Sequence, residues 1–141
     1  MSDVHTPEQR TRNMKAIRGR DTKPEMRVRS LAHRLGYRFR LHRKGLPGRP
    51  DLVFPGLKKV IFVHGCFWHQ HPGCRYATRP RTREAFWAGK LDGNRARDLK
   101  QIAELERLGW EVLVIWECQT KDEDALRDQI RRFLGEKPAG R

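Results

Sequence analysis

Apolar residues at helical spacing mark the clearest helix of the chain. Thr22 followed three residues later by Glu25 is typical of a capping box, and Gly36 is typical of a helix end. Between them the apolar positions recur every three or four residues, so they fall on one face of a helix. They are Val28, Leu31, Ala32 and Leu35. We therefore expect a helix over 22–36 that packs against a sheet.

Three further segments have helical patterns. Thr6 and Pro7 are typical of a helix start and predict a short basic helix through about residue 17. Another helix is expected to follow Gly93 and to end at Gly109, because apolar residues recur between them at helical spacing. These residues are Leu99, Ile102, Ala103, and Leu105 or Leu108. An amphipathic pattern predicts a last helix over about 122–134.

Strands alternate with these helices. Residues 37–41 alternate apolar and polar side chains, which is the period of a half-buried strand. Residues 51–54 and 60–63 are short apolar runs separated by Pro55-Gly56, and residues 110–116 form the most strand-like run. Nearly continuous apolarity indicates strands covered on both faces. The order helix, three strands, helix, strand, helix therefore predicts an α/β protein, a three-layer α/β/α fold with a mixed central sheet.

The chain has the size of one domain, because 141 residues allow one sheet-plus-helices core and are too few for two. We assign residues 1–20 to a basic N-terminal helical arm, 21–135 to the domain and 136–141 to a tail. No run of about 18 apolar residues predicts a membrane span. The first residues lack a secretory signal pattern, so the expected location is the cytoplasm.

The chain is strongly basic, with a formal net charge of +14. Residues 1–50 carry +10, residues 51–91 carry +5 and residues 92–141 carry −1. A polyanion is therefore the expected partner, bound by the first two thirds of the chain. The alternative is a soluble, highly charged surface without a partner.

The ten residues 65–74, GCFWHQHPGC, concentrate metal ligands and aromatic side chains. With Cys118, which follows the last predicted strand, the stretch offers three cysteines and a histidine at a spacing that suits a closed, structural zinc site. The set is Cys66, His71, Cys74 and Cys118. His69 or His64 could replace His71 as the ligand. Inert cysteines beside an exposed histidine are the alternative.

A second set of polar residues suits phosphodiester hydrolysis. Asp51 stands at the head of a predicted strand, where a carboxylate can hold Mg²⁺. His64 and His69 lie close together in the sequence, and a neutral imidazole is a competent base for water near pH 7. Glu25 could add a second carboxylate, although its capping role already explains it. The alternative for Asp51 is an ion pair with a nearby arginine.

Large aromatic residues accompany both sets. Phe67 and Trp68 flank His69, and Trp87 could join them from a later loop. Aromatic side chains beside a basic surface can wedge between base steps of DNA and unstack them. The alternative is a cluster that packs over the zinc. Trp110 and Trp116 are assigned to the core.

The motifs together closely resemble the very-short-patch repair (Vsr) endonucleases, over nearly the whole chain. They are PGRPD at 47–51, IFVHGCFWH at 61–69, FW at 86–87, and GW followed by VIWEC within 109–118. The resemblance implies a restriction-endonuclease-like fold with a structural zinc loop. It also implies a Mg²⁺-dependent nick, in one strand, on the 5′ side of the T in a T:G mismatch left by deamination of 5-methylcytosine.

Particular roles follow from the resemblance. Asp51 and the backbone carbonyl of Val63 would bind Mg²⁺, His69 would activate water, His64 would assist at the phosphate and Glu25 would support the site. Phe67, Trp68 and Trp87 correspond to an intercalating wedge, and Cys66, His71, Cys74 and Cys118 to the zinc ligands. The substrate would be double-stranded DNA with a T:G mismatch, bound by a monomer. Whether a cytosine-5 methyltransferase or mismatch-repair accessory proteins act with it stays open.

Three departures from the expected pattern concern the two metal sites. Val63 and Gly65 stand where the broader nuclease fold has an acidic residue and a lysine, so the cation site depends on histidine. Some relatives carry Thr at position 63. Pro72-Gly73 makes the zinc loop one residue longer than in some relatives. Two rival functions remain, a zinc-stabilised DNA-binding module without catalysis and a nuclease of the same fold that cuts fully paired DNA.

Overall fold

Four strands form a single mixed sheet in the computed structural model, which describes residues 22–135. In sheet order they are β1 (Arg40–Leu41), β2 (Leu52–Phe54), β3 (Lys59–His64) and β4 (Glu111–Trp116). The first two pairings are antiparallel, and β3 pairs with β4 in parallel, in a register that ends at His64 opposite Trp116. The predicted mixed sheet is confirmed.

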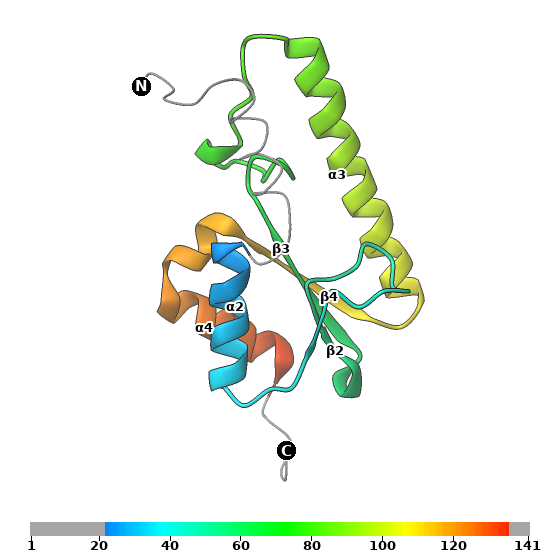
Figure 1. Cartoon of the computed structure of the whole chain (residues 1–141), viewed down its shortest axis with the longest axis vertical. Helices are drawn as coiled ribbons and strands as arrows, with labels where there is room; N and C mark the ends of the chain where they lie inside the picture. Colours follow the sequence, from blue (N-terminus) through cyan, green and yellow to red (C-terminus); the bar gives the residue numbers. More distant parts are fainter. Residues whose placement is uncertain (1–21, 136–141) are drawn as a thin grey trace.

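Helices cover both faces of this sheet (Figure 1). α2 (Lys23–Arg34) and α4 (Glu123–Leu134) lie on one face, and α3 (Glu84–Arg107) lies on the other and makes the crossover between the parallel strands. Successive side chains of β2 point to opposite faces of the sheet. Leu52 and Phe54 join the core under α2 and α4, and Val53 joins the core under α3. The result is the expected three-layer order.

Short 3₁₀ turns complete the connections. They are η1 (Pro55–Leu57), η2 (Arg75–Ala77) and η3 (Glu117–Lys121). η1 joins β2 to β3, η2 lies in the segment between β3 and α3, and η3 carries the chain from β4 to α4. Within residues 22–135, no helix combines the length and apolarity needed to cross a bilayer.

The helix expected over 22–36 is confirmed as α2. The Thr22 hydroxyl accepts a hydrogen bond from the Glu25 backbone N–H at 3.4 Å, and Gly36 follows the helix with φ of 91°. The apolar face packs into the core as predicted, with Val28 fully buried and Leu31 2 % exposed. This start fixes the first turn of α2 and therefore the position of the Glu25 side chain.

The prediction for α3 was wrong at its start. The helix begins at Glu84 rather than after Gly93, so Phe86 and Trp87 belong to its first turn instead of a loop. A glycine inside a helix costs only about 1 kcal/mol relative to alanine, which the packing of a long helix can offset. Leu99 and Leu108, assigned to the apolar face, are 62 % and 57 % exposed.

Two further expectations need correction. Only Arg40–Leu41 of the predicted 37–41 strand pairs with β2, although Tyr37 is buried and Phe39 packs beside the core as the alternation predicted. Trp110 is buried, but Trp116 is only partly buried and lies between two histidines rather than in the core. The predicted helix over 6–17, the whole N-terminal arm of residues 1–20 and the tail lie outside the described residues.

Candidate active site

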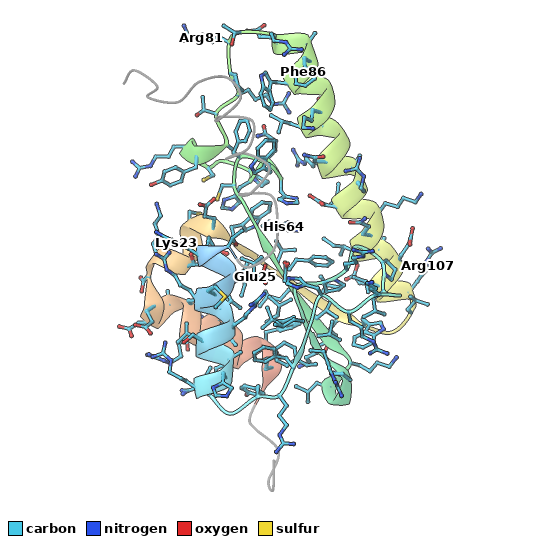
Figure 2. All side chains as sticks on the ribbon, viewed as in Figure 1. Lys23, Glu25, His64, Arg81, Phe86 and Arg107 are labelled. Atoms are coloured by element: carbon cyan, nitrogen blue, oxygen red, sulfur yellow. The ribbon has the colours of Figure 1, made fainter. Side chains whose placement is uncertain are left out.

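The acidic and histidine residues singled out by the sequence converge on one pocket of about 370 Å³. The first turn of α2 contributes Glu25, the residue before β2 contributes Asp51, and the end of β3 contributes His64. His69 comes from the loop after β3 and Asp98 from the middle of α3. Figure 2 shows Glu25 and His64 near the centre of the molecule, at the junction of the layers.

Asp51 is held by the neighbouring strand. Its Oδ2 accepts a hydrogen bond of 2.7 Å from the backbone N–H of Val63. Burial, with a smaller contribution from the nearby Glu25, raises the pKa of Asp51 to about 7 despite the lowering effect of the Val63 hydrogen bond. A buried carboxylate that is costly to ionise by itself is stabilised in its charged form by a bound cation. The N–H and C=O of one strand residue face the same side, so the Val63 carbonyl is directed toward Asp51 as well.

Glu25 has a role beyond the helix start. Its side chain is 3 % exposed and pairs with Arg29, one turn along α2. His42, which follows β1, brings its Nε2 to 2.9 Å from Glu25 Oε2 and to 3.6 Å from Asp51 Oδ1. The sequence motifs do not reveal His42, because its position in a polar turn has no local signal of a site.

His64 and His69 stack face to face, with ring centroids 3.9 Å apart and planes 7° from parallel. Burial, with a smaller contribution from His69, lowers the pKa of His64 to about 3, so His64 is neutral at physiological pH. His69 donates a hydrogen bond of 2.6 Å from Nδ1 to Asp98 Oδ2. That bond leaves the Nε2 lone pair of a neutral His69 available to accept a proton.

Asp98 is a site residue absent from the sequence predictions. A signal was present, because Asn94, Asp98 and Gln101 recur at helical spacing and form a polar stripe on α3. All three line the pocket, and the Asn94 amide also donates to the Trp68 carbonyl at 3.1 Å. A polar stripe on the side of a helix that faces a sheet indicates a site rather than a core.

The cysteines and one histidine form a separate cluster. One ligand atom each from Cys66, His71, Cys74 and Cys118 lies within 4.8 Å of the others, and all three cysteines are free thiols. His71 Nδ1 is 3.7 Å from Cys66 Sγ and 3.5 Å from Cys118 Sγ. Ligands about 2.0–2.3 Å from a tetrahedral zinc ion stand about 3.6 Å apart, so this donor set fits zinc.

Local turns build the loop that supplies these ligands. The His71 N–H donates to the Cys66 carbonyl at 3.0 Å, and the His69 N–H donates to the Gly65 carbonyl at 3.1 Å. As a result His71 faces the cysteines while His64 and His69 face the pocket, which favours His71 among the three candidate ligands.

The aromatic side chains gather in a cluster of their own. Phe67 lies 5.0 Å from Trp68 and 5.6 Å from Trp87, measured between ring centroids, and all three are partly buried. Phe86, to which the sequence motifs assigned no wedge role, is 48 % exposed and packs 5.4 Å from Trp87. It lies at the end of α3 opposite Arg107 (Figure 2). The ring stacked on His71 of the cysteine cluster is instead Trp116.

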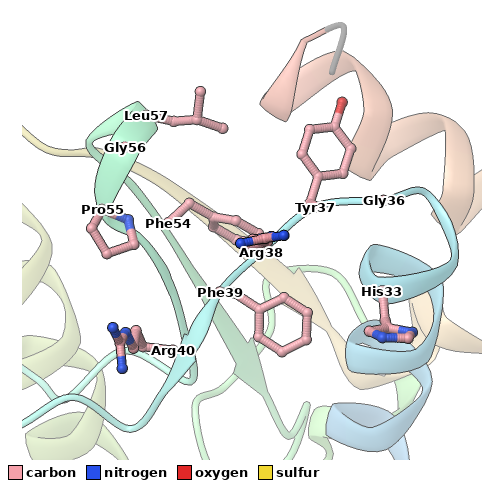
Figure 3. Close-up of a pocket in the computed structure, with 10 residues that line it drawn as sticks. All are labelled: His33, Gly36, Tyr37, Arg38, Phe39, Arg40, Phe54, Pro55, Gly56 and Leu57. Atoms are coloured by element: carbon pink, nitrogen blue, oxygen red, sulfur yellow. The ribbon is translucent and has the colours of Figure 1, made fainter. Parts of the chain in front are cut away.

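A larger cavity of about 660 Å³ lies elsewhere, between the end of α2 and η1 (Figure 3). Aromatic rings of Tyr37, Phe39 and Phe54 line it together with Arg38 and Arg40. None of the residues that line it is acidic or a cysteine, so the chemistry described above belongs to the smaller pocket.

Comparison with known proteins agrees with the motifs. A family model described as DNA mismatch endonuclease Vsr matches residues 2–75. A type II nicking enzyme of Xanthomonas oryzae pv. oryzae is 50 % identical over 134 residues, which are 95 % of this chain and 98 % of that protein. The DNA mismatch endonuclease Vsr of Escherichia coli K12 is 45 % identical over 129 residues, 92 % of this chain and 82 % of that protein.

A third relative, a type II nicking enzyme of Neisseria meningitidis, is 38 % identical over 136 residues, 96 % of each chain. The family match covers more than half of the chain, and these relatives align with it over most of their length. The resemblance drawn from the motifs is thereby confirmed. This chain belongs to the Vsr family of DNA mismatch endonucleases and is an endodeoxyribonuclease.

Proposed function

We propose that the chain nicks one strand of double-stranded DNA on the 5′ side of the T in a T:G mismatch, with Mg²⁺ as cofactor. The observation that carries the proposal is the pairing of His69 with Asp98 at 2.6 Å in the same pocket as Asp51 and Glu25. A base oriented by a carboxylate and a second carboxylate that can bind a cation are the two parts that metal-assisted hydrolysis of a phosphodiester needs.

The residues divide the chemistry among them. A divalent cation held by Asp51 and the Val63 carbonyl would neutralise charge that develops on the phosphate. His69 takes a proton from the attacking water at Nε2, and Asp98 holds the imidazole in the required tautomer and stabilises its positive charge. His64 is neutral and donates an N–H to a phosphate oxygen. The new bond forms from water oxygen to phosphorus, and the bond to the leaving oxygen breaks.

Selection of the lesion is assigned to Phe67, Trp68 and Trp87. They form one aromatic cluster, and two of them adjoin His69 in the sequence. A wedge of this kind costs less at a mismatched step, because the pairing and stacking it must break are already weakened. Basic residues on the phosphates would set the position of the DNA, and binding should weaken steeply with salt.

The fold and the second metal belong to the same proposal. We assign the three layers and mixed sheet to a restriction-endonuclease-like fold, and the cluster of Cys66, His71, Cys74 and Cys118 to a structural zinc site. A closed set of four protein ligands leaves no position for substrate. One site per chain suits a monomer that cuts one strand.

Cleavage of matched duplexes tests the proposed reaction. With Mg²⁺, the wild type should nick the T strand of an end-labelled duplex with one T:G pair and leave the T:A duplex intact. His69→Ala should reduce the single-turnover rate by about 10²- to 10³-fold through loss of the general base. His33→Ala is the control, because His33 is an exposed histidine on α2 and does not line the pocket. Cleavage of both duplexes at one rate contradicts the mismatch specificity.

Replacement of Trp68 should reduce discrimination between T:G and T:A duplexes rather than the rate of the cleavage step. For Trp68→Ala we expect the preference for T:G over T:A in equilibrium binding to fall about tenfold or more, in line with about 1–3 kcal/mol for one base stacked on an aromatic ring. Fluorescence anisotropy on the two duplexes measures the preference. Tyr76→Ala, which removes a 44 % exposed aromatic outside the cluster, should leave it unchanged. An equal loss of affinity for both duplexes would assign Trp68 to packing.

A rival target has support in the names of the relatives. Two of the compared proteins are called type II nicking enzymes, a name that does not specify a mismatch. The T:A duplex in the cleavage experiment therefore also tests a nickase of fully paired DNA, which would keep Asp51 and His69 and have no use for the aromatic cluster.

A further inference from the structure

His42 stands between the two carboxylates of the pocket region, and no role above accounts for it. It follows β1, and its backbone N–H donates to the Asp51 carbonyl at 3.3 Å. Its φ of 46° lies in the left-handed region, which is uncommon for a residue with a side chain. This conformation turns the imidazole inward, where the side chain is 13 % exposed.

The distances around His42 match those between ligands of one cation. Nε2 is 2.9 Å from Glu25 Oε2 and 3.6 Å from Asp51 Oδ1, and one ligand atom from each of these residues lies within 4.8 Å of the others. Neighbouring ligands of an octahedral ion, each about 2.1 Å from the metal, stand about 3 Å apart. The three side chains are therefore close enough to share a cation.

The direction of the imidazole distinguishes shared ligation from an ordinary ion pair. His42 Nε2 is buried, and among the described residues it has no partner in hydrogen-bond geometry despite the short distance to Glu25. The Nε2 lone pair or N–H therefore does not point at Glu25 Oε2, although the two atoms are close. Donors that face a common point have this arrangement, whereas a histidine that bridges two carboxylates would point at one of them.

Arg29 helps to hold the Glu25 carboxylate in place for a cation. It pairs with the same Glu25 Oε2 that His42 approaches, so the carboxylate has a fixed position before a cation arrives. Its positive charge also offsets part of the repulsion between Glu25 and Asp51, which both face His42.

We propose that His42 and Glu25 ligate the cation together with Asp51, and that this nitrogen-containing site prefers Mn²⁺ to Mg²⁺. Mg²⁺ favours all-oxygen ligation, whereas imidazole suits transition metals, and Mn²⁺ shares with Mg²⁺ a tolerance for carboxylate and water ligands. The inference rests on the proposed function for the identity of the site. It departs from that function by adding these two ligands and reordering the preference between cations.

Mn²⁺ binding tests the proposal on the full chain with its zinc in place. Titration of the free Mn²⁺ signal by electron paramagnetic resonance gives the Kd for Mn²⁺, and competition gives the Kd for Mg²⁺. His42→Asn should weaken Mn²⁺ binding about tenfold or more, as loss of metal-site residues typically does, and should change Mg²⁺ binding less than about twofold. Asparagine is chosen because it tolerates a positive φ.

A spectroscopic measurement on the wild type makes the test independent of any variant. Electron spin-echo modulation from a nitrogen bound directly to Mn²⁺ should appear in the wild type, change on ¹⁵N-histidine labelling, and vanish in His42→Asn. His64→Asn is the matched control, since it removes the neighbouring imidazole and should keep the signal. Absence of a nitrogen signal in the wild type overturns the proposal.

Two other outcomes also contradict it. A signal that survives in His42→Asn and disappears in His64→Asn would place the ion among His64, His69 and Asp98, the other histidine-containing cluster. Equal weakening of Mn²⁺ and Mg²⁺ binding in His42→Asn would contradict the proposal that His42 makes the site prefer Mn²⁺. Failure of mismatch nicking in the cleavage assay, with the nitrogen signal intact, would instead refute the proposed function and leave the ligand assignment standing.

Discussion

Asp51→Asn should abolish nicking and yet make the cation-free protein more stable at neutral pH. The activity loss, expected at about 10⁴-fold or more, follows from removal of a carboxylate that the proposed cation requires, since metal stabilisation of the transition state is worth several kcal/mol. The stability gain follows from burial, because it raises the pKa of Asp51 to about 7.

The contribution of Asp51 to the stability of the wild type should fall as pH rises, because Asp51 keeps its proton more strongly in the folded protein than in the unfolded chain. An aspartate in the unfolded chain has an ordinary pKa of 3.8, whereas Asp51 in the folded protein has a pKa of about 7, so between these values the folded protein keeps a proton that the unfolded chain has released. This contribution to stability is therefore largest below pH 4 and is lost as pH rises toward 7. Asparagine cannot ionise. The free energy of unfolding of Asp51→Asn should therefore exceed that of the wild type by a few kcal/mol at pH 8 and by almost nothing at pH 4.

Urea unfolding at pH 4, 6 and 8 without divalent cations measures this difference. Asp124→Asn is the control, because its side chain is 94 % exposed and its replacement should alter stability little at any of the three pH values. Addition of Mg²⁺ should stabilise the wild type and leave Asp51→Asn unaffected. A variant that is less stable than the wild type at pH 8 would show that the Val63 hydrogen bond, rather than burial, dominates at Asp51.

Loss of one cysteine from the zinc cluster should destabilise the whole domain. For Cys118→Ser we expect zinc content to fall well below one per chain and the free energy of unfolding to drop by more than about 4 kcal/mol, because loss of a structural metal is among the largest effects of a point mutation. The cluster joins the loop after β3 to η3, so its ligands connect segments about fifty residues apart.

Elemental analysis of dialysed protein and thermal unfolding followed by circular dichroism measure the two quantities. A drop in Tm of more than about 10 °C is expected from a loss of this size. Thr78→Ala, a change at a polar residue near the same loop, is the control. Wild-type protein that contains no zinc and melts at the same temperature as Cys118→Ser would refute the structural zinc.

Residues with a local signature could be predicted from the sequence. Asp51 at the head of a strand, the two histidines after β3 and the cysteine spacing each follow from short patterns, and the structure brings these residues into two clusters. The helices and strands flanking them were also predictable, because their apolar positions recur at the periods of α2, β2, β3 and α4.

Residues that depend on packing could not be found in this way. Asp98 meets His69 only because α3 packs across the sheet beside the loop after β3, and a polar stripe on a helix does not by itself name its partner in another segment. His42 meets Asp51 because β1 pairs with β2 at the edge of the sheet, and it meets Glu25 because α2 packs beside these strands. No short-range periodicity encodes a contact between such distant segments.

Trp116 physically connects the two clusters of the molecule. Its ring stacks on His71 with centroids 4.3 Å apart and meets His64 edge to face at 5.3 Å. One indole ring therefore separates His71, the proposed zinc ligand, from His64, which is proposed to contact the phosphate. We therefore expect partial loss of the proposed zinc to disturb His64 through this ring, and to reduce turnover before the domain unfolds.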